Sequence, residues 1–337
     1  MKPTDFATHL TEFLSMYLPR QKNASKNTVA SYHDTFKLLI RYCQAQRDIP
    51  VEKLNMSMMT HGLIADFLEW LEKDRKCSIS TRNQRLAAIH SFFRYVQYEE
   101  PAGILHFQKV IAIPVKKVTK PSVPHLTPEA MKLLLSQPDK TTAKGRRDLT
   151  LISILYDSGC RVQELADLKV RDVVLNNPAV LILTGKGNKV RRVPLMKNTL
   201  TLLEHYIQEN SLDKPWKSDY PLFINKQHNK LTKEGIAYII SRYVISARKT
   251  SAIVPEKVMP HMFRHSKAMH LLQAGVSLIY IRDFLGHEDI KTTELYAKCD
   301  SELKRQAIEN AYPDLVDSNL PDWNKDAALL DWLSNLN

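Results

Sequence analysis

Hydrophobic residues in the first hundred positions recur at steps of three and four, which is the spacing of one face of an α-helix. Four such series are present, over residues 6–17, 29–42, 63–71 and 86–96. Asn27 precedes the second series and Ser80 precedes the fourth, and both residue types favour the N-terminal cap of a helix. The pattern predicts four helices with short connections, which is typical of a compact helical bundle, over residues 1–103.

The segment 104–124 does not continue this helical spacing. Three prolines interrupt it, and it carries three closely spaced lysines, Lys116, Lys117 and Lys120. A charged segment with several prolines is typical of a linker between domains. We therefore predict a linker over residues 104–124, whose lysines either contact nucleic-acid phosphates or face solvent.

From residue 125 the pattern predicts more helices and one pair of strands. Thr127 followed by Pro128 is a typical helix start. Helical spacing follows over residues 144–157, 162–168, 197–209, 232–248, 261–273, 277–284, 289–297 and 301–311. Residues 179–184 and 189–195 are strand-like and flank a glycine-containing turn. Because strands and helices do not alternate, we predict a second, mainly helical domain over residues 125–311 with a small antiparallel sheet.

The charge of the chain changes what its partner is expected to be. The 337 residues carry a formal net charge of +12, with a pI of about 9.4, which favours a polyanionic partner. Residues 1–124 contain 18 Lys and Arg against 11 Asp and Glu, and residues 125–311 contain 29 against 20. We expect both predicted domains to contact the polyanion.

The tail, residues 312–337, has the opposite charge, with one Lys against five Asp. Its apolar residues step by four, three and three positions, as in an amphipathic helix: Trp323, Ala327, Leu330 and Leu333. Such a helix either docks on a neighbouring subunit or packs on its own domain. The tail is therefore expected to contact protein and not nucleic acid.

The cysteines and apolar runs exclude several classes of protein. Cys43, Cys77, Cys160 and Cys299 form no CxxC pair, and the twelve histidines form no cluster with metal-ligand spacing. We predict reduced thiols in a cytoplasmic protein without a metal site. No signal peptide is evident, and no apolar run reaches the roughly 18 residues of a membrane span, so no membrane partner is expected.

Two positively charged groups stand beside glycine turns. Arg161 follows a turn that contains Gly159, and its guanidinium could contact two phosphate oxygens. Lys186 lies between Gly185 and Gly187 at the tip of the predicted hairpin, where it could protonate a leaving oxygen. Lys189 competes for this role but begins a strand.

A further group of candidates lies in the last third of the chain. His261 and Arg264 are three residues apart in the first turn of a helix, an end that favours anions. His287 follows Gly286, and Tyr296 offers a phenol nucleophile whose unperturbed pKa is near ~10. We place His265 on a different helix face and interpret it as structural. Each of these residue types is common on its own.

Together, four motifs resemble those of tyrosine recombinases of the phage integrase family: GCRVQEL, TGKGNKVRRVPL, HMFRHS and LGHEDIKTTELYA. The resemblance covers residues from about 5 to 311, and the first domain resembles the helical core-type DNA-binding (SAM-like) domain of that family. It implies six catalytic residues: Arg161, Lys186, His261, Arg264, His287 and Tyr296. Further DNA contacts are predicted from neighbouring cations: Lys116, Lys117, Lys120, Lys189, Arg191 and Arg192.

The resemblance also implies a mechanism. The two arginines hold the scissile phosphate, Tyr296 attacks it to form a 3′-phosphotyrosyl link, and Lys186 protonates the leaving 5′-oxygen. His261 accepts the phenol proton and His287 supports the phosphate. No metal, ATP or other cofactor is expected to take part.

The expected partners are double-stranded DNA and other copies of the chain, in a tetrameric synapse that acts at the nucleoid. The layout is similar to Xer-type or transposon-borne recombinases, without an additional arm-site DNA-binding domain. The sequence leaves open whether the enzyme integrates or excises a mobile element or resolves DNA multimers. Two alternatives are a relaxing type IB topoisomerase and a non-catalytic DNA-binding regulator, and the complete set of six residues argues against the regulator.

Overall fold

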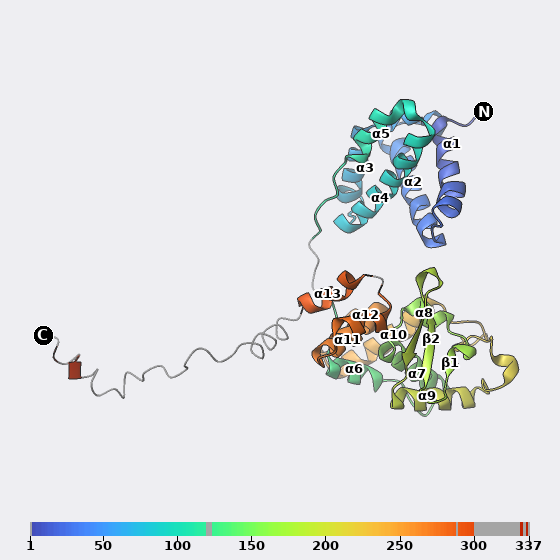
Figure 1. Cartoon of the computed structure of the whole chain (residues 1–337), viewed down its shortest axis with the longest axis vertical. Helices are drawn as coiled ribbons and strands as arrows, with labels where there is room; N and C mark the ends of the chain where they lie inside the picture. The colour runs from blue at the N-terminus through green and yellow to red at the C-terminus, as the bar shows by residue number, and fades with distance from the viewer. Residues whose placement is uncertain (1, 119–122, 288, 300–330, 333–334, 336–337) are drawn as a thin grey trace. The chain divides into compact units, whose positions relative to one another are not determined.

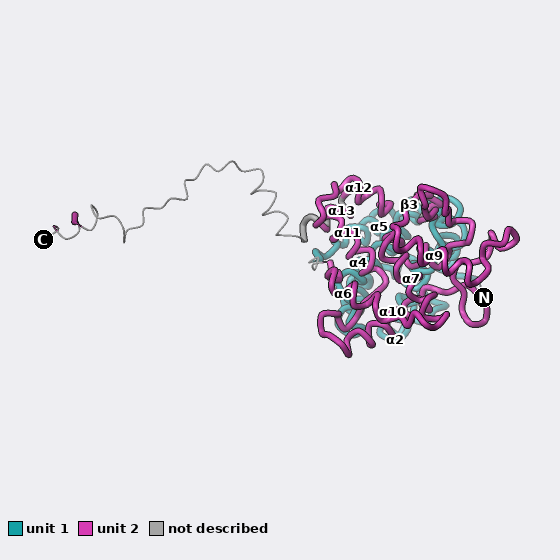
Figure 2. Tube along the Cα trace, turned by 90° about the horizontal axis from the view of Figure 1, so that it is seen from below, with its two compact units in different colours: residues 1–121 teal, residues 122–337 magenta. Residues whose placement is uncertain are grey.

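The computed structural model describes residues 2–118, 123–287, 289–299, 331–332 and 335. The chain forms two compact units, residues 1–121 and 122–337, which Figure 2 shows in different colours. Three sequence predictions lie outside the described residues: Lys120, the helix over residues 301–311 and the apolar stripe of the tail (Trp323, Ala327, Leu330 and Leu333).

In its described residues, unit 1 forms helices and no strand (Figure 1). Its helices are α1 (Asp5–Glu12), the π-helix η1 (Phe13–Gln21), α2 (Lys26–Arg47), α3 (His61–Lys73), α4 (Ile79–Glu99) and α5 (Ile104–Ile111), with short 3₁₀ turns at Val51–Lys53, Met56–Met58 and Pro101–Gly103. The four predicted helical series fall within these elements. The caps lie slightly earlier than predicted, because Ser25 and Ser78, and not Asn27 and Ser80, accept hydrogen bonds from the first turns of α2 and α4.

The core of unit 1 is built around aromatic rings from segments far apart in the sequence. Phe13 is fully buried, and its ring centroid lies 5.4 Å from that of Phe92 on α4. Phe36 on α2 meets Phe92 at 5.0 Å, also edge to face. Such contacts add to the apolar burial that holds the helices together.

The predicted linker begins too early. Residues 104–111 form α5, which buries Phe107 and Val110 against α4, so the chain leaves the core of unit 1 only after this helix. The prolines that suggested a linker all lie beyond it. Because α5 has only eight residues, its apolar spacing was too short to stand out from the charged segment that follows.

Unit 2 combines helices with one small sheet. Its elements are α6 (Pro128–Leu135), α7 (Ala143–Asp157), α8 (Val162–Asp167), β1 (Val173–Val174), β2 (Val180–Thr184), β3 (Val190–Pro194), α9 (Lys197–Glu209), α10 (Lys233–Thr250), α11 (Pro260–Gln273), α12 (Leu278–Leu285) and α13 (Ile290–Cys299), with 3₁₀ turns at Val170–Asp172, Lys186–Asn188 and Pro215–Lys217. The three strands are antiparallel in the order β1-β2-β3. The mainly helical class with a small antiparallel sheet is therefore confirmed, although the sequence pattern did not reveal the two-residue β1.

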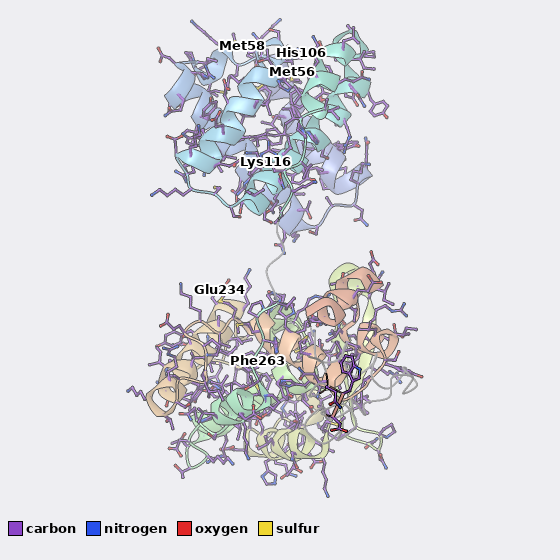
Figure 3. All side chains as sticks on the ribbon, turned by 90° about the vertical axis from the view of Figure 1, so that its left-hand side faces the viewer. Met56, Met58, His106, Lys116, Glu234 and Phe263 are labelled. Carbon is purple, nitrogen blue, oxygen red and sulfur yellow. The ribbon has the colours of Figure 1, made fainter. Side chains whose placement is uncertain are left out.

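The core of unit 2 joins the sheet to the central helices. Leu181 and Leu183 alternate inward from β2, while α7 packs against both α9 and α11. Phe263 of α11, labelled in Figure 3, is fully buried in the same cluster. This packing fixes α11, which carries several of the candidate site residues.

The first residues of unit 2 are tied to α11. The Leu126 main-chain N–H donates to Ser266 Oγ at 2.8 Å, and His270 Nε2 lies 2.9 Å from the Leu126 carbonyl oxygen. Val123 is buried in a cluster with Tyr296. We call residues 123–126 the entry segment.

Within the described part of the chain, every helix is too short or too polar to cross a lipid bilayer.

The packing of unit 1 predicts that Phe13→Ala lowers its stability by about 3–5 kcal/mol, because a fully buried ring is replaced by a cavity. Hydrogen exchange of the amides in unit 1 measures this change. Tyr98→Ala is the control, since Tyr98 is 78% exposed and its loss should change stability by no more than about 0.5 kcal/mol. Equal effects of the two substitutions would contradict the aromatic core.

Candidate active site

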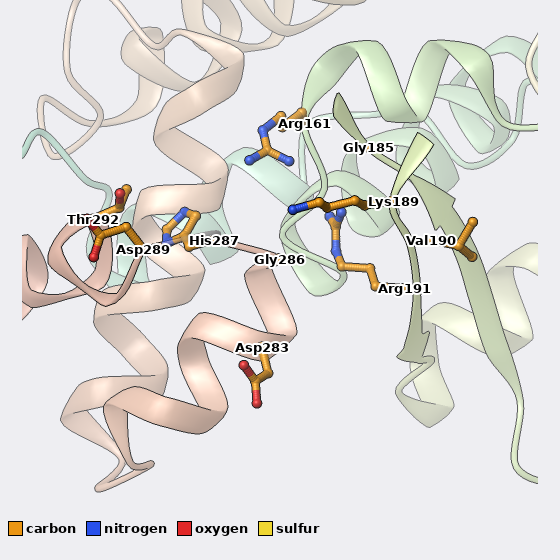
Figure 4. A pocket seen from close by; sticks show the side chains of 10 residues that line it. All are labelled: Arg161, Gly185, Lys189, Val190, Arg191, Asp283, Gly286, His287, Asp289 and Thr292. Carbon is orange, nitrogen blue, oxygen red and sulfur yellow. The ribbon is translucent and has the colours of Figure 1, made fainter. Parts of the chain in front are cut away.

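A cavity of about 530 Å³ opens in unit 2 where three segments meet. Figure 4 shows the start of α8 and the β2–β3 hairpin on one side, and α12 with the turn into α13 on the other. The lining residues are Arg161, Gly185, Lys189, Val190, Arg191, Asp283, Gly286, His287, Asp289 and Thr292. The cavity brings together segments that lie up to 131 positions apart, from Arg161 to Thr292.

Glu164 holds two of the arginines. Its side chain is almost completely buried and accepts hydrogen bonds from Arg161 Nη1 at 2.7 Å, and from Arg191 Nη1 and Nη2 at 3.1 and 2.7 Å. Its Oε2 also accepts the main-chain N–H of Arg161 at 2.8 Å, which caps α8. One carboxylate therefore fixes both guanidinium groups.

The charge state of Glu164 follows from the same contacts. Burial alone would raise the pKa of the carboxyl group, but the hydrogen bonds from Arg191 and from Arg161 outweigh it and bring the pKa to about 2. The carboxylate is therefore ionised at neutral pH. Glu164 is not among the residues predicted from the sequence, although its position three residues after Arg161 is a capping spacing that could have indicated it.

Arg264 joins the two sides of the site. It is buried, with 4% of its surface exposed, and donates through Nη1 to the Gly159 carbonyl at 2.7 Å and through Nη2 to the Leu285 carbonyl at 2.6 Å. Burial, followed by repulsion from Arg161 and Arg191, lowers its pKa to about 10, so it remains a cation at neutral pH. The cations therefore crowd together, as in a site for an anion.

Two glycines permit the close packing of the segments that form the site. Gly159 has φ +55°, and a Cβ there would lie 2.8 Å from Leu285 Cδ2. Gly286 has φ +67°, and a Cβ would lie 2.9 Å from Arg191 Cδ. Side chains at either position would be strained by the backbone and would collide with the walls of the site.

Tyr296 lies in an apolar cluster beside the cavity. Of the described residues, ten line the cavity, and Tyr296 is not one of them, since it is only 2% exposed. Burial raises the pKa of its phenol, while Arg264 and Arg161 act in the opposite direction. Its ring lies nearly parallel to that of His287, with the centroids 6.4 Å apart.

The predicted histidines His261 and His287 differ in their surroundings. His261 is exposed, whereas His287 is half-buried and its Nδ1 lies 2.9 Å from Thr293 Oγ1. Burial, followed by Arg264 and Arg161, lowers the pKa of His287 to about 4, so that its ring is neutral at neutral pH.

His265 departs from the sequence interpretation. It was set apart from the site as structural, but its Nδ1 lies 2.9 Å from the Tyr296 hydroxyl oxygen. His265 follows His261 by four residues, one helical turn, so the two share a face and the assignment to a different face was wrong.

The remaining predicted residues of unit 2 lie on or beside the β2–β3 hairpin. The main chain of Lys186 begins the 3₁₀ turn at the hairpin tip, and Lys189 and Arg191 line the cavity. Arg192 is exposed.

Of the three linker lysines predicted to contact DNA, the two that the structure describes also differ. Lys116, labelled in Figure 3, pairs with Glu72 of unit 1 at 2.8 Å, and its main chain bonds to Asn83. Lys117 is exposed. In the described part of the chain, no group of three or more His, Cys, Asp or Glu side chains is placed to hold a metal ion.

The sequence matches the phage integrase family over residues 124–302 and the phage integrase N-terminal SAM-like domain over residues 9–101. A Sinorhizobium fredii protein named integrase/recombinase y4rC is 34% identical, over 93% of this chain and 93% of that protein. The tyrosine recombinase XerC of Myxococcus xanthus is 31% identical, over 90% of this chain and 97% of that protein. The chain belongs to the phage integrase family.

This enzyme is thus a tyrosine-type site-specific recombinase, as its motifs predicted, and its N-terminal domain is of the SAM-like type. Its fold also resembles that of the Tn1549 transposon integrase, solved in complex with a circular intermediate DNA. The TM-score is 0.70 at 19% identity, and the match covers 89% of this chain and 98% of that chain.

The buried contacts of Glu164 in the recombinase predict that the loss of stability caused by Glu164→Gln depends on pH. The pKa is about 2 in the folded state and 4.5 ordinarily, so the ionised group stabilises the fold by on the order of 3 kcal/mol at neutral pH. Because the folded pKa is depressed, this contribution is present above about pH 4.5 and is lost as pH falls towards 2.

Urea unfolding of the wild type and the Gln variant should therefore differ most at pH 7 and progressively less below pH 4.5. Glu209→Gln is the matched control, because Glu209 forms an exposed pair with Arg146 that should contribute at most about 1 kcal/mol. A difference for Glu164→Gln that stays constant from pH 7 to 3 would rule out the ionised carboxylate as its cause.

Proposed function

We propose that the recombinase cuts and rejoins double-stranded DNA through a covalent bond between Tyr296 and a 3′-phosphate. The observation that carries this proposal is the cationic cavity, lined by Arg161, Arg191 and His287 and flanked by segments that Arg264 holds together. The planar donors of a guanidinium match the two non-bridging oxygens of a phosphodiester. Burial, followed by repulsion from Arg161 and Arg191, lowers the pKa of Arg264, and an anion bound there would relieve this repulsion.

Each candidate then has a role in one step. Arg161 and Arg264 hold the scissile phosphate and stabilise the charge that develops in the transition state. Tyr296 attacks phosphorus and frees a 5′-hydroxyl, and Lys186 at the hairpin tip protonates the leaving oxygen. His287 supports the phosphate by a hydrogen bond.

The reaction as proposed draws on side chains alone. The phosphotyrosyl bond conserves the energy of the broken phosphodiester, so the 5′-hydroxyl can reverse the step without ATP. The positive charge comes from arginine and lysine, and no metal ion or other cofactor enters the step.

We propose that both units contact the same DNA duplex, since both regions of sequence are basic. In unit 2, Lys189, Arg191 and Arg192 belong to the contacting surface of that unit. In unit 1, Lys117, on the segment that follows α5, is a separate contact. Lys116 is a weaker candidate, because its ammonium group already pairs with Glu72.

Exchange between two DNA sites requires one Tyr296 for each strand that is cut, so the proposed acting form is a tetramer of this chain. The biological role is integration or excision of a mobile element, or resolution of DNA multimers, in the cytoplasm at the nucleoid. The names of two relatives, integrase/recombinase y4rC and tyrosine recombinase XerC, support DNA recombination as the activity.

The proposed nucleophile predicts that Tyr296→Phe abolishes the covalent complex while DNA affinity stays within about twofold, because only one oxygen is lost. The assay uses a nicked suicide duplex, whose site is first selected from random-sequence DNA by binding to the full-length protein. Covalent product is measured by denaturing gel, and the wild type is the positive control. Covalent product from the Phe variant would assign the attack to another residue, and wild-type relaxation of plasmids without two-site exchange would indicate a topoisomerase.

The proposed acid predicts that Lys186→Ala slows cleavage by about 100-fold or more on ordinary DNA. A substrate with sulfur at the 5′-bridging position should restore the rate, because a thiolate leaves without protonation. Lys189→Ala, three residues away, is the comparison and should show no such rescue. Rescue of the Lys189 variant alone would transfer the acid role to Lys189.

A further inference from the structure

The hydroxyl group of Tyr296 has a defined partner in the resting enzyme. His265 Nδ1 lies 2.9 Å from this oxygen, and the two ring centroids are 5.7 Å apart. The phenol is otherwise packed in an apolar cluster with Ala268 and Leu285. The contact is therefore a specific polar one in an apolar environment, where a hydrogen bond strongly restricts orientation.

The other two histidines are less suited to this partnership. His261 is exposed, and its role as proton acceptor was predicted only from the family resemblance. His287 faces the Tyr296 ring nearly in parallel, at an interplanar angle of 16°, and its Nδ1 is engaged with Thr293. Of these three histidines, His265 is the one whose ring nitrogen lies within hydrogen-bond distance of the Tyr296 hydroxyl oxygen.

The surroundings of His265 keep its ring able to accept a hydrogen bond. Burial, followed by the nearby His261, Arg264 and His125, lowers the pKa of His265 to about 4. The ring is therefore neutral at neutral pH and has one nitrogen without a proton. Burial raises the pKa of the Tyr296 phenol, so its hydroxyl keeps its proton in the resting state and can donate it in a hydrogen bond.

We propose that His265 is a catalytic residue of this recombinase: its Nδ1 accepts the hydrogen bond of the Tyr296 hydroxyl, orients the oxygen and takes its proton during attack on phosphorus. The inference rests on the proposed role of Tyr296 as nucleophile. It transfers to His265 the acceptor role that the sequence predicted for His261.

The step is balanced in atoms and electrons. A lone pair of Tyr296 Oη forms the bond to phosphorus, and the bond from phosphorus to the 5′-oxygen breaks with its electron pair remaining on that oxygen. The 5′-oxygen takes a proton from the general acid, and the Oη proton passes to His265 Nδ1. Rejoining reverses each transfer, with His265 returning the proton to Oη.

The acidities of the Tyr296 phenol and of the protonated His265 ring determine when the proton moves. In the resting enzyme the proton stays on Oη, because imidazole at this position is a far weaker base than phenolate. As the bond to phosphorus forms, Oη becomes acidic and the negative phosphate stabilises the imidazolium, so the proton moves together with bond formation.

The test compares two substitutions of His265 in the suicide-duplex assay. His265→Ala removes the acceptor, and His265→Asn keeps an acceptor oxygen near the position of Nδ1 but cannot hold the proton. We expect both variants to form the covalent complex about 100-fold or more slowly than the wild type, with DNA affinity within about twofold. Added imidazole should restore part of the rate of the Ala variant in a saturable manner.

His270→Asn is the matched control. His270 lies on the same helix and also bonds to a tyrosine, with Nδ1 2.9 Å from the Tyr156 hydroxyl, so its substitution disturbs α11 in a similar way. Its covalent rate should stay within about tenfold of the wild type. Thermal melting establishes that each variant is folded, and His265→Asn decides the test if His265→Ala is not.

Several results would overturn the inference. A wild-type rate for His265→Asn would reduce His265 to a hydrogen-bond acceptor that takes no proton. A rate for His265→Ala equal to or above that of the wild type would show that the contact is dispensable or restrains the nucleophile. Absence of covalent product from the wild type would overturn the proposed function and this inference together, whereas the first two results would leave the proposed function intact.

Discussion

The guanidinium group of Arg264 is buried, and it donates to main-chain carbonyls on both sides of the site, Gly159 before α8 and Leu285 at the end of α12. A buried cation is stable only when its donors are satisfied, so these carbonyls must stay where they are. They precede Arg161 and His287 by two residues each. The placement of the cavity walls thus depends on one side chain that is almost inaccessible to solvent.

Glu164 provides the second part of this arrangement. It neutralises part of the charge of Arg161 and Arg191 and holds their guanidinium groups in place, yet it leaves Arg264 near them without a carboxylate of its own. The site therefore contains an excess of positive charge in fixed positions, which is what a preorganised phosphate site requires. The positive φ of Gly159 and Gly286 shows that the backbone also adapts to this packing.

Much of this could be predicted from the sequence, because regular spacing reports directly on helices and on the β2–β3 hairpin. The short α5 and the two-residue β1 offered too few positions for a pattern. Of the residues that line the cavity, the sequence predicted Arg161, Lys189, Arg191 and His287, but the contacts of Glu164 and His265 depend on tertiary packing. The four-residue spacing from His261 to His265 was visible in the sequence, and only the structure shows that Tyr296 of another helix reaches it.

The entry segment has a mechanical consequence. Its Val123 is packed with Tyr296, and Leu126 is fastened at both its N–H and its carbonyl to α11, the helix that carries His261, Arg264 and His265. Tension transmitted along the chain from unit 1 therefore acts on the contacts of Val123 and Leu126 before it acts on the rest of unit 2. Tyr296 and its neighbours are thus the first part of unit 2 to bear tension from the N-terminal side of the chain.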